Sequence, residues 1–361
     1  MTLIPNLPEL AARARADLRM GLPVAISLAG QAALVTAAET LDAARLAGLR
    51  ALGPVTLAIT PRRAETLKAR AYSDHVARVI VPGDAGVEWI HSVADPADDL
   101  SAPMKGPLTT ERGGDEDIAR AAVMLAKAAH LLPAAVLVTV DDARAVAAEN
   151  RLTWLALDRL GDLIPNGPLA EVVAARVPLA VSEAGRVHVF RPRDGGEEHY
   201  AVEIGRPERS KPVLARLHSA CFTGDLMGSL KCDCGPQLRA ALAAMGEAGA
   251  GVLLYLNQEG RGIGLANKMR AYSLQDQGFD TVEANHRLGF EDDERDFRIG
   301  SEILSALSFS SVRLMTNNPA KVAMMQANGI EVVERVPLKA GHSAHNAAYL
   351  ATKAKKSGHL L

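Results

Sequence analysis

The sequence has few cysteines, few aromatic residues and almost no net charge. Its 361 residues include three cysteines, 4% aromatic residues and a formal charge of −2. The cysteines are odd in number and all lie between positions 221 and 234, which favours a single site over a disulfide framework. A charge this close to zero provides no overall field for wrapping a polyanion such as DNA, so any anion site must be local. We therefore expect no nucleic-acid polymer as a partner.

The chain also lacks a long hydrophobic run. Its longest uncharged stretch, Met20 to Ala38, is interrupted by glycine, proline and polar residues. The N-terminus lacks the basic patch and apolar core of a secretory signal. We therefore expect a cytoplasmic protein with no membrane partner.

Length and composition predict two folded domains. Apolar residues make up 48% and charged residues 23% of the chain, and a domain holds roughly 150 residues. Short β-branched runs alternate with helical patterns, so the predicted class is α/β (α+β), with a mixed sheet and packed helices in each domain. Two prolines, Asn and Gly gather between Ile164 and Pro168. We place the domain boundary there, giving domains 1–166 and 167–361.

Periodicity and turn residues predict the individual elements. The expected strands are 22–28, 55–59, 136–140, 185–191, 200–204, 213–217, 251–256, 312–315 and 330–336. The expected helices are 40–52, 118–131, 237–248, 266–277, 296–307 and 320–328. The turn-rich Asp194 to Gly196 predicts that 185–191 and 200–204 pair in antiparallel fashion.

The cysteines form the strongest local signal. Cys232 and Cys234 are two residues apart and lie on one side of an extended chain, while Cys221 precedes them. Thiolate sulfur suits Zn²⁺, and a zinc ion with three protein ligands keeps an open position at which the pKa of water falls towards about 7. Two alternatives remain open, namely a structural Cys3His zinc site that uses His218, or three unrelated buried cysteines.

A glycine-rich turn, Asn257 to Gly264, follows the strand predicted at 251–256. Such a turn can offer backbone N–H groups to an anion, although the G-x-G-x-G spacing matches neither the dinucleotide nor the P-loop fingerprint, and a plain connecting loop is the alternative. Several cations could complete a polyphosphate site. They are Arg216, Arg261, Lys268, Arg270, Arg295 and Lys321.

Two further motifs allow a structural and a functional interpretation. Asp292 to Phe297 has the acidic character of a helix N-terminus, where carboxylates favour the dipole. Thr316 to Pro319 is suited to cap a strand end before a helix. The functional alternative for the second motif is side-chain contact with a purine or a phosphate.

Taken together, these segments resemble GTP cyclohydrolase II. The segments are His218 to Cys221, Thr223 to Asp225, Cys232 to Gly235, Gln258 to Arg261, Asp293 to Phe297 and Thr316 to Pro319. The likeness extends to Arg270 to Tyr272, Leu274 to Gly278, Thr281 to His286 and Gly358 to Leu361, and spans about residues 170–361.

The resemblance implies a reaction and a set of cofactors. Cys221, Cys232 and Cys234 would hold one catalytic Zn²⁺ per subunit of a homodimer, and Mg²⁺ would accompany the triphosphate of GTP. Water activated at the zinc attacks C8 of GTP, and formate and pyrophosphate leave. The product is 2,5-diamino-6-(5-phosphoribosylamino)pyrimidin-4(3H)-one, formed in the first step of riboflavin biosynthesis.

The resemblance also implies residue roles. Arg295 matches the proposed nucleophile at the α-phosphate, Asp293 the proton acceptor beside it, and Tyr272 the residue that steers the ring-opened intermediate. Because a guanidinium is normally charged, charge stabilisation is the alternative role for Arg295. Glu259 would recognise donor groups on guanine. The substrate-binding set is Arg216, His218, Ser219, Gln237, Glu259, Gly260, Arg261, Thr281, Thr316 and Lys321.

Two positions depart from the family pattern. Ala220 stands where the family usually has Glu, and Lys231 stands where it usually has Arg. These changes leave two alternatives open. One is a related enzyme with another outcome, such as a formylated pyrimidine or a role in pyrimidine breakdown. The other is a non-catalytic nucleotide-binding protein.

Residues 8–164 resemble dihydroxybutanone-phosphate synthase faintly. That enzyme needs a carboxylate-rich loop after its first strand to hold Mg²⁺ and a sugar phosphate. Here the strand continues into Ala29 to Ala33, with no acid until Glu39, and Gly114 to Asp117 replaces the family's Gly-His-Thr-Glu. We predict a synthase-like fold without synthase activity, retained for packing, dimerisation or regulation.

Overall fold

The computed structural model describes residues 3–163 and 169–341 and divides the chain into two compact units. Unit 1 comprises Met1–Asn166 and Ala266–Asp292, and unit 2 comprises Gly167–Leu265 and Asp293–Leu361. One division falls between Asn166 and Gly167, where the breaker cluster lies. Residues 266–292, which the sequence places in the domain 167–361, pack within unit 1 in this structure.

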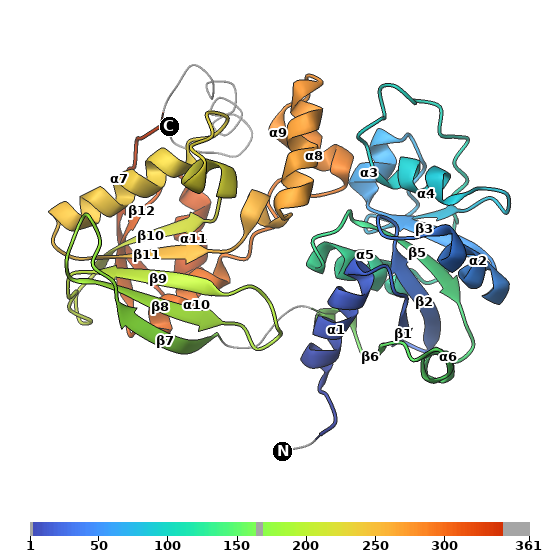
Figure 1. The fold of residues 1–361 in the computed structure, drawn as a ribbon, viewed down its shortest axis with the longest axis horizontal. Coiled ribbons are helices and arrows are strands. Elements are labelled where there is room, and N and C mark those ends of the chain that lie inside the picture. Colours follow the sequence, from blue (N-terminus) through green and yellow to red (C-terminus); the bar gives the residue numbers. More distant parts are fainter. Residues whose placement is uncertain (1–2, 164–168, 342–361) are drawn as a thin grey trace. The chain divides into compact units, whose positions relative to one another are not determined.

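Unit 1 is built on a six-stranded sheet (Figure 1). Its strands are β1 (Val24–Leu28), β2 (Gln31–Ala37), β3 (Val55–Ile59), β4 (Ala77–Ile80), β5 (Ala134–Thr139) and β6 (Trp154–Leu157). They lie in the order β4-β3-β5-β2-β1-β6, and only the β1–β6 pair is parallel. Ala29 and Gly30 have φ angles of 51° and 80° and form the two-residue turn from β1 to β2. Positive φ at both turn residues suits the twist of a tight hairpin, so β1 reverses directly into β2.

The helices of unit 1 come from two stretches of the chain. The first stretch supplies α1 (Leu7–Arg19), α2 (Ala43–Leu52), α3 (Pro61–Thr66), α4 (Val87–Ala94), α5 (Asp117–Ala128), α6 (Ala143–Asn150) and η1 (Leu160–Leu163). The second supplies most of α8 (Leu265–Asp276) and all of α9 (Thr281–Leu288). Small and branched residues of α5, such as Ala121, Ala122 and Leu125, are buried in the core of the sheet. The small side chains allow the helix to approach the strands closely.

Unit 2 is built on a seven-stranded mixed sheet. Its strands are β7 (Ala170–Arg176), β8 (Gly185–Arg191), β9 (His199–Ile204), β10 (Val213–Ser219), β11 (Gly251–Leu256), β12 (Ser311–Met315) and β13 (Glu331–Val336). The order is β13-β12-β10-β11-β9-β8-β7, with β13, β12, β10 and β11 parallel and the rest antiparallel. The predicted antiparallel pairing of 185–191 with 200–204 is confirmed. The carboxyl ends of the four parallel strands meet at one edge of the sheet, which is where open α/β sheets place their ligands.

Helices cover both faces of this sheet (Figure 1). They are α7 (Cys234–Glu247), α10 (Arg298–Ala306) and α11 (Pro319–Ala327), with short helical turns η2 (Phe222–Leu226) and η3 (Glu259–Gly262). Side chains of β10 alternate between two cores: Val213 and Leu217 pack with α10 and α11, whereas Leu214 packs with α7. The predicted class, two mixed α/β domains with packed helices, is confirmed. Within the described residues, no helix combines the length and the apolar character needed to cross a membrane.

Candidate active site

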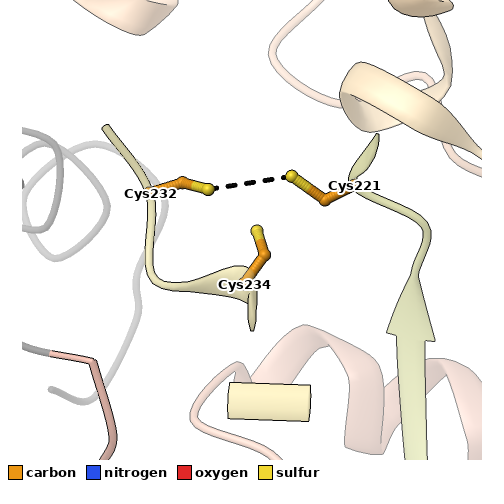
Figure 2. Close-up of side chains that lie close together, drawn as sticks. All are labelled: Cys221, Cys232 and Cys234. Atoms are coloured by element: carbon orange, nitrogen blue, oxygen red, sulfur yellow. Dashed lines mark hydrogen bonds between the residues drawn. The ribbon is translucent and has the colours of Figure 1, made fainter. Parts of the chain in front are cut away.

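The three cysteines converge at the carboxyl end of β10. Cys221 follows the strand, Cys232 lies in the next loop and Cys234 is the first residue of α7. All three Sγ atoms lie within 4.8 Å of one another, and those of Cys221 and Cys232 are 3.7 Å apart (Figure 2). Among the residues that the structure describes, these three side chains form the group that is close enough to share a metal ion.

Gly224 leaves the space between the thiols open. A Cβ atom at this position would lie 2.7 Å from Sγ of Cys232 and 3.0 Å from Sγ of Cys221. Its backbone N–H donates to Sγ of Cys221 at 3.3 Å. Glycine is therefore the residue that allows the turn to wrap around the three sulfur atoms.

The thiols resist simultaneous ionisation by themselves. The pKa of Cys234 is raised well above its ordinary value by the neighbouring Cys221 and Cys232 thiols and by burial. Cys221 likewise raises the pKa of Cys232. A bound cation reverses this preference because it stabilises the thiolates together, and soft sulfur donors suit Zn²⁺ among the common divalent ions. The donor set therefore fits a thiolate-bound metal ion.

Asp225 anchors the turn that carries Cys221. Its carboxylate accepts hydrogen bonds from the backbone N–H of Cys221 at 3.0 Å and from the Tyr255 hydroxyl at 3.0 Å, and it lies 3.0 Å from Nε2 of His218. His218 is buried and stacks on Tyr255, and burial lowers the pKa of this histidine. Because His218 turns this nitrogen towards Asp225, the arrangement does not support the Cys3His alternative. Sequence patterns alone assign no role to Asp225 or Tyr255, although an acid within the turn after a thiol ligand is a usable signal for such an anchor.

Arg216 is buried on the same strand with an incomplete set of partners. Its Nη1 donates to the carbonyl of Met315 at 3.0 Å and its Nη2 to Oε1 of Gln237 at 2.6 Å. Gln237 in turn donates to Asp233 at 2.6 Å. Nε of Arg216 is buried and has no hydrogen-bond partner among residues 3–163 and 169–341, and burial lowers the pKa of the guanidinium to about 10. An unpartnered donor of this kind is costly and is satisfied by an incoming anion.

Arg295 forms a bidentate ion pair with Asp293. The two contacts measure 2.7 Å and 2.5 Å, and Nη1 of Arg295 donates to the Ser219 hydroxyl at 3.2 Å. Burial would raise the pKa of Asp293, but the hydrogen bonds and charge of Arg295 outweigh it and lower that pKa. The pair is therefore ionised at neutral pH.

Lys321, which is buried like Arg216, is a third cation beside the same strand end. Its Nζ donates to the carbonyl of Leu217 at 3.2 Å and lies 4.8 Å from the ring centre of Phe297. Arg295 lies over the same ring at 4.7 Å. Together with Arg216, these residues concentrate positive charge at the carboxyl ends of β10 and β12.

The glycine-rich turn after β11 is tied to the cysteine turn by Glu259. One carboxylate oxygen accepts from the N–H of Phe222 at 2.6 Å and the other from the N–H of Gly260 at 2.9 Å. Gly260 and Arg261 both have φ near 64°, in the left-handed region. The carbonyl of Arg261 accepts from the N–H of Glu294 at 3.0 Å, which joins this turn to the segment that begins with Asp293.

The motif after β12 shapes the strand end. The Thr316 hydroxyl accepts from the N–H of Asn318 at 3.0 Å, and Asn318 caps α11 by accepting from Ala320 at 3.0 Å. Asn317 donates to and accepts from the backbone of Leu338. The contacts of this motif are therefore those of a cap between the end of β12 and the start of α11.

Unit 2 contains every predicted site residue except Tyr272 and Thr281. These two lie on α8 and α9, which belong to unit 1. On α8, Arg270 pairs with Glu39 at 3.0 Å and with Asp95 at 3.3 Å. The role of Arg270 at a phosphate stays a prediction; in this structure its partners are the two carboxylates of unit 1.

Unit 1 contains a cavity of about 440 Å³ that includes none of the predicted site residues. Its walls come from α3, α5 and Glu291. The cationic side chains that line it are Arg62, Arg120 and Lys127, and the acidic ones are Glu65, Asp74 and Glu291. These formal charges cancel.

A thiolate metal site beside buried cations, at the carboxyl edge of parallel strands, defines a metal-dependent enzyme suited to an anionic substrate. Residues 170–337 match the family described as GTP cyclohydrolase II. A protein named GTP cyclohydrolase-2 from Azospirillum brasilense is 46% identical over 358 residues, which cover 96% of this chain and 93% of that protein. The chain therefore belongs to the GTP cyclohydrolase II family, a family of hydrolases in riboflavin biosynthesis.

Other relatives are shorter. A GTP cyclohydrolase-2 from Azotobacter vinelandii is 57% identical over 175 residues, 48% of this chain and 84% of that protein. One from Pseudomonas aeruginosa strain LESB58 is 55% identical over 190 residues, 53% of this chain and 92% of that protein. These alignments use most of each relative but only about half of this chain.

Similar solved structures include a two-domain 3,4-dihydroxy-2-butanone 4-phosphate synthase from A. baumannii. It covers 90% of this chain and 99% of that chain, with 16% identity and a TM-score of 0.34. A cation-free 3,4-dihydroxy-2-butanone 4-phosphate synthase covers 42% of this chain and 92% of that chain, with 16% identity and a TM-score of 0.32. TM-scores of this size do not establish a common fold.

Proposed function

We propose that this chain hydrolyses the imidazole ring of GTP and releases formate and pyrophosphate. The product would be 2,5-diamino-6-(5-phosphoribosylamino)pyrimidin-4(3H)-one, formed in the first step of riboflavin biosynthesis. The observation that carries the proposal is the cluster of three thiols, held open by Gly224, at the strand end where three cations converge. Membership of the family supports the same reaction.

Cys221, Cys232 and Cys234 would hold one Zn²⁺. When bound, zinc supplies Lewis acidity and lowers the pKa of water for attack at C8 of the purine. Asp225 fixes the backbone of Cys221 and so keeps this ligand in place. Carboxylates that orient a metal ligand in this way typically support metal affinity.

Asp293 and Arg295 would act at the α-phosphate. Their ion pair is bidentate, and Arg295 lowers the pKa of Asp293, so the carboxylate keeps its charge beside the guanidinium. This supports stabilisation of developing negative charge by Arg295, rather than attack by a neutral guanidine. Ser219 orients the guanidinium by accepting a hydrogen bond from Nη1.

The remaining cations and polar groups would bind the nucleotide. Arg216 can offer its unpartnered Nε–H to a phosphate oxygen, with Mg²⁺ neutralising further charge on the triphosphate. Glu259, whose oxygens accept the N–H groups of Phe222 and Gly260, would recognise donor groups on guanine. Tyr272 would steer the ring-opened intermediate. The other proposed substrate contacts are His218, Gln237, Gly260, Arg261, Thr281, Thr316 and Lys321.

Unit 1 would be a synthase-like unit without synthase activity. The tight turn at Ala29 and Gly30 occupies the place where a metal-binding carboxylate loop would be needed. Glu39, the first acid beyond it, accepts from the N–H of Leu132 at 2.8 Å and pairs with Arg270. Release of dihydroxybutanone phosphate from ribulose 5-phosphate by the full chain would contradict this assignment. We further propose that the protein is cytoplasmic and forms a homodimer. Light scattering of the purified protein measures its mass in solution and so tests the homodimer.

The test of the reaction is incubation of the zinc-loaded protein with GTP and Mg²⁺, with formate and pyrophosphate measured separately. The proposal predicts both products from the unmodified chain and neither from Cys232→Ser. Lys231→Arg is the matched control, since it changes the adjacent residue to the family's usual one and should retain both products. Pyrophosphate without free formate would instead indicate the formylated product. GTP binding without either product would indicate a non-catalytic protein.

A further inference from the structure

Residues 266–292 belong to unit 1 but are inserted in the sequence between two segments of unit 2. The segment before them carries the turn Glu259 to Gly262, and the segment after them begins with Asp293. These two ends meet within unit 2: the N–H of Glu294 donates to the carbonyl of Arg261 at 3.0 Å. A Cβ on Gly262 would lie 2.8 Å from the carbonyl oxygen of Glu294, so the backbones are in close contact. The excursion therefore has its base at the turn of Glu259 and the ion pair of Asp293.

Unit 1 holds the α8 part of this excursion through a network of polar contacts. Arg270 pairs with Glu39 and Asp95 and donates to Oδ1 of Asn267 at 2.8 Å. Asn267 is fully buried and donates to the carbonyl of His130 at 3.1 Å. Glu39 also accepts from the N–H of Leu132, so one carboxylate fixes both α8 and the start of β5. Asn267 is the buried member of this network, and a shift of α8 would leave its amide without a partner.

The α9 part is held around a second carboxylate, Asp99. Arg63 is almost fully buried and donates to Asp99 at 2.9 Å and to the carbonyl of Arg287 at 3.5 Å. Arg287 itself lies 3.6 Å from Asp99. Asp99 keeps its charge, because its pKa is lowered by Arg63 and Lys105 in spite of burial.

The C-terminal end of α9 packs closely against the start of α3. Gly289 has a φ of 90°, and a Cβ there would lie 2.7 Å from the Thr60 hydroxyl and 2.9 Å from Pro133. Two residues later, Glu291 pairs with Arg62 at 3.0 Å. Contacts with unit 1 therefore continue along the chain as far as Glu291, two residues before Asp293.

We infer that the N-terminal part of unit 1 is a mount for residues 266–292, that is, a support that holds α8 and α9 in one position. We further infer that Glu39 is a positioning residue for the reaction proposed above. Both helices are joined along the chain to the two ends that form the base of the excursion, where Glu259 and Asp293 lie. The relatives from Azotobacter and Pseudomonas align with 48% and 53% of this chain, whereas the Azospirillum relative aligns with 96% of it. The inference rests on the proposed function for its effect on turnover, but not for its effect on α8.

The test uses Glu39→Gln in the full-length protein. The amide oxygen can still accept from Leu132, but the charge that pairs with Arg270 is lost. Glu111→Gln is the matched control, because Glu111 also pairs with an arginine of unit 1, Arg78 at 3.0 Å, and accepts from the Thr56 hydroxyl at 2.8 Å, both outside residues 266–292. Hydrogen exchange of α8 and α9, zinc content, and kcat and KM for GTP are measured for all three proteins.

The mount predicts faster exchange of the α8 amides in Glu39→Gln only. It also predicts a kcat lowered by roughly tenfold, with KM within about twofold and zinc content unchanged, because small misplacements of catalytic groups mainly affect turnover. Faster exchange with unchanged kcat would overturn the positioning role. Unchanged exchange would overturn the mount itself. If the unmodified protein does not act on GTP, the proposed function fails, while the exchange result still decides whether Glu39 holds α8.

Discussion

Each unit buries an arginine, but the two side chains have different surroundings. Arg63 in unit 1 donates to the carbonyl of Val93 at 2.8 Å, to Asp99 and to further backbone carbonyls. Arg216 in unit 2 has two partners, and its Nε has none. A buried guanidinium with a full set of acceptors stabilises the fold, whereas one with a donor left over retains capacity for a ligand. The difference separates structural from functional polar residues within one chain.

Strand direction explains why the two kinds of arginine occur where they do. Only the β1–β6 pair of the unit 1 sheet is parallel, and successive strands such as β1 and β2 are joined by a tight turn. Parallel strands in unit 2 direct several loops to one edge, and the thiols, Arg216 and Lys321 collect there. An edge of this kind brings together groups from distant parts of the sequence.

Gly224→Ala should have the largest effect. The added methyl would lie 2.7 Å from Sγ of Cys232, so the thiols must separate. We expect zinc affinity to fall by more than about 100-fold, together with the loss of GTP hydrolysis. Zinc titration with a competing chelator measures the affinity. Gly228→Asn is the control in the same loop, because nothing lies within 4 Å of its Cβ position; equal losses in both variants would refute the role of Gly224.

Arg63→Met should mainly lower the stability of the fold, whereas Arg216→Met should mainly lower the activity. Removing Arg63 leaves Asp99 with fewer partners, and we expect the free energy of unfolding to fall by about 3 kcal/mol, as measured in urea. Removing Arg216 should cost less stability but lower kcat/KM for GTP by roughly 10- to 100-fold, since a hydrogen bond to a charged group contributes about 1.5–3 kcal/mol. The distinction fails if Arg63→Met is as stable as the unmodified protein, or if Arg216→Met retains full kcat/KM.

Asp225→Asn should weaken the metal site without unfolding unit 2. The amide loses the charge that holds the N–H of Cys221 and His218, and zinc affinity should fall by roughly 10- to 100-fold. Circular dichroism checks the fold, and the chelator titration checks the metal. A variant with unchanged zinc affinity would show that Asp225 only packs the turn.

The smallest effect concerns His199 and pH. Burial lowers the pKa of His199 from 6.5 to about 4, although the charges of Asp194 and Asp296 oppose the shift. The unfolded chain therefore takes up the proton first, so stability is complete above pH 6.5 and decreases as the pH falls towards 4. At pH 5 we expect a loss of about 2 kcal/mol relative to pH 7.

His199→Asn isolates this contribution. The amide oxygen can accept from the N–H of Asn257 as Nδ1 does at 3.0 Å, but it does not titrate. Urea unfolding at pH 7 and pH 5 should show a smaller decrease for the variant than for the unmodified chain. Equal decreases in the two proteins would mean that His199 titrates normally.

Sequence periodicity located most elements of unit 2. The expected strand 251–256 is β11, and the expected helix 320–328 corresponds to α11 (Pro319–Ala327). In unit 1 several elements were not predicted, among them α1, β2 and α6. The strand β2 is buried on both faces near its end, so it lacks the alternation that marks a half-buried strand.

Spacing and chemical type in the sequence by themselves determined the thiol cluster, the two-domain organisation and the family. These features are local: two cysteines at i and i+2 share a side, and a breaker cluster separates two patterns. The tertiary structure alone decided that Asp225 joins His218 to Tyr255, that Nε of Arg216 lacks a partner, and that residues 266–292 pack within unit 1. Each of these depends on contacts between residues far apart in the chain, such as Glu39 and Arg270, and such contacts are set by packing rather than by any local pattern.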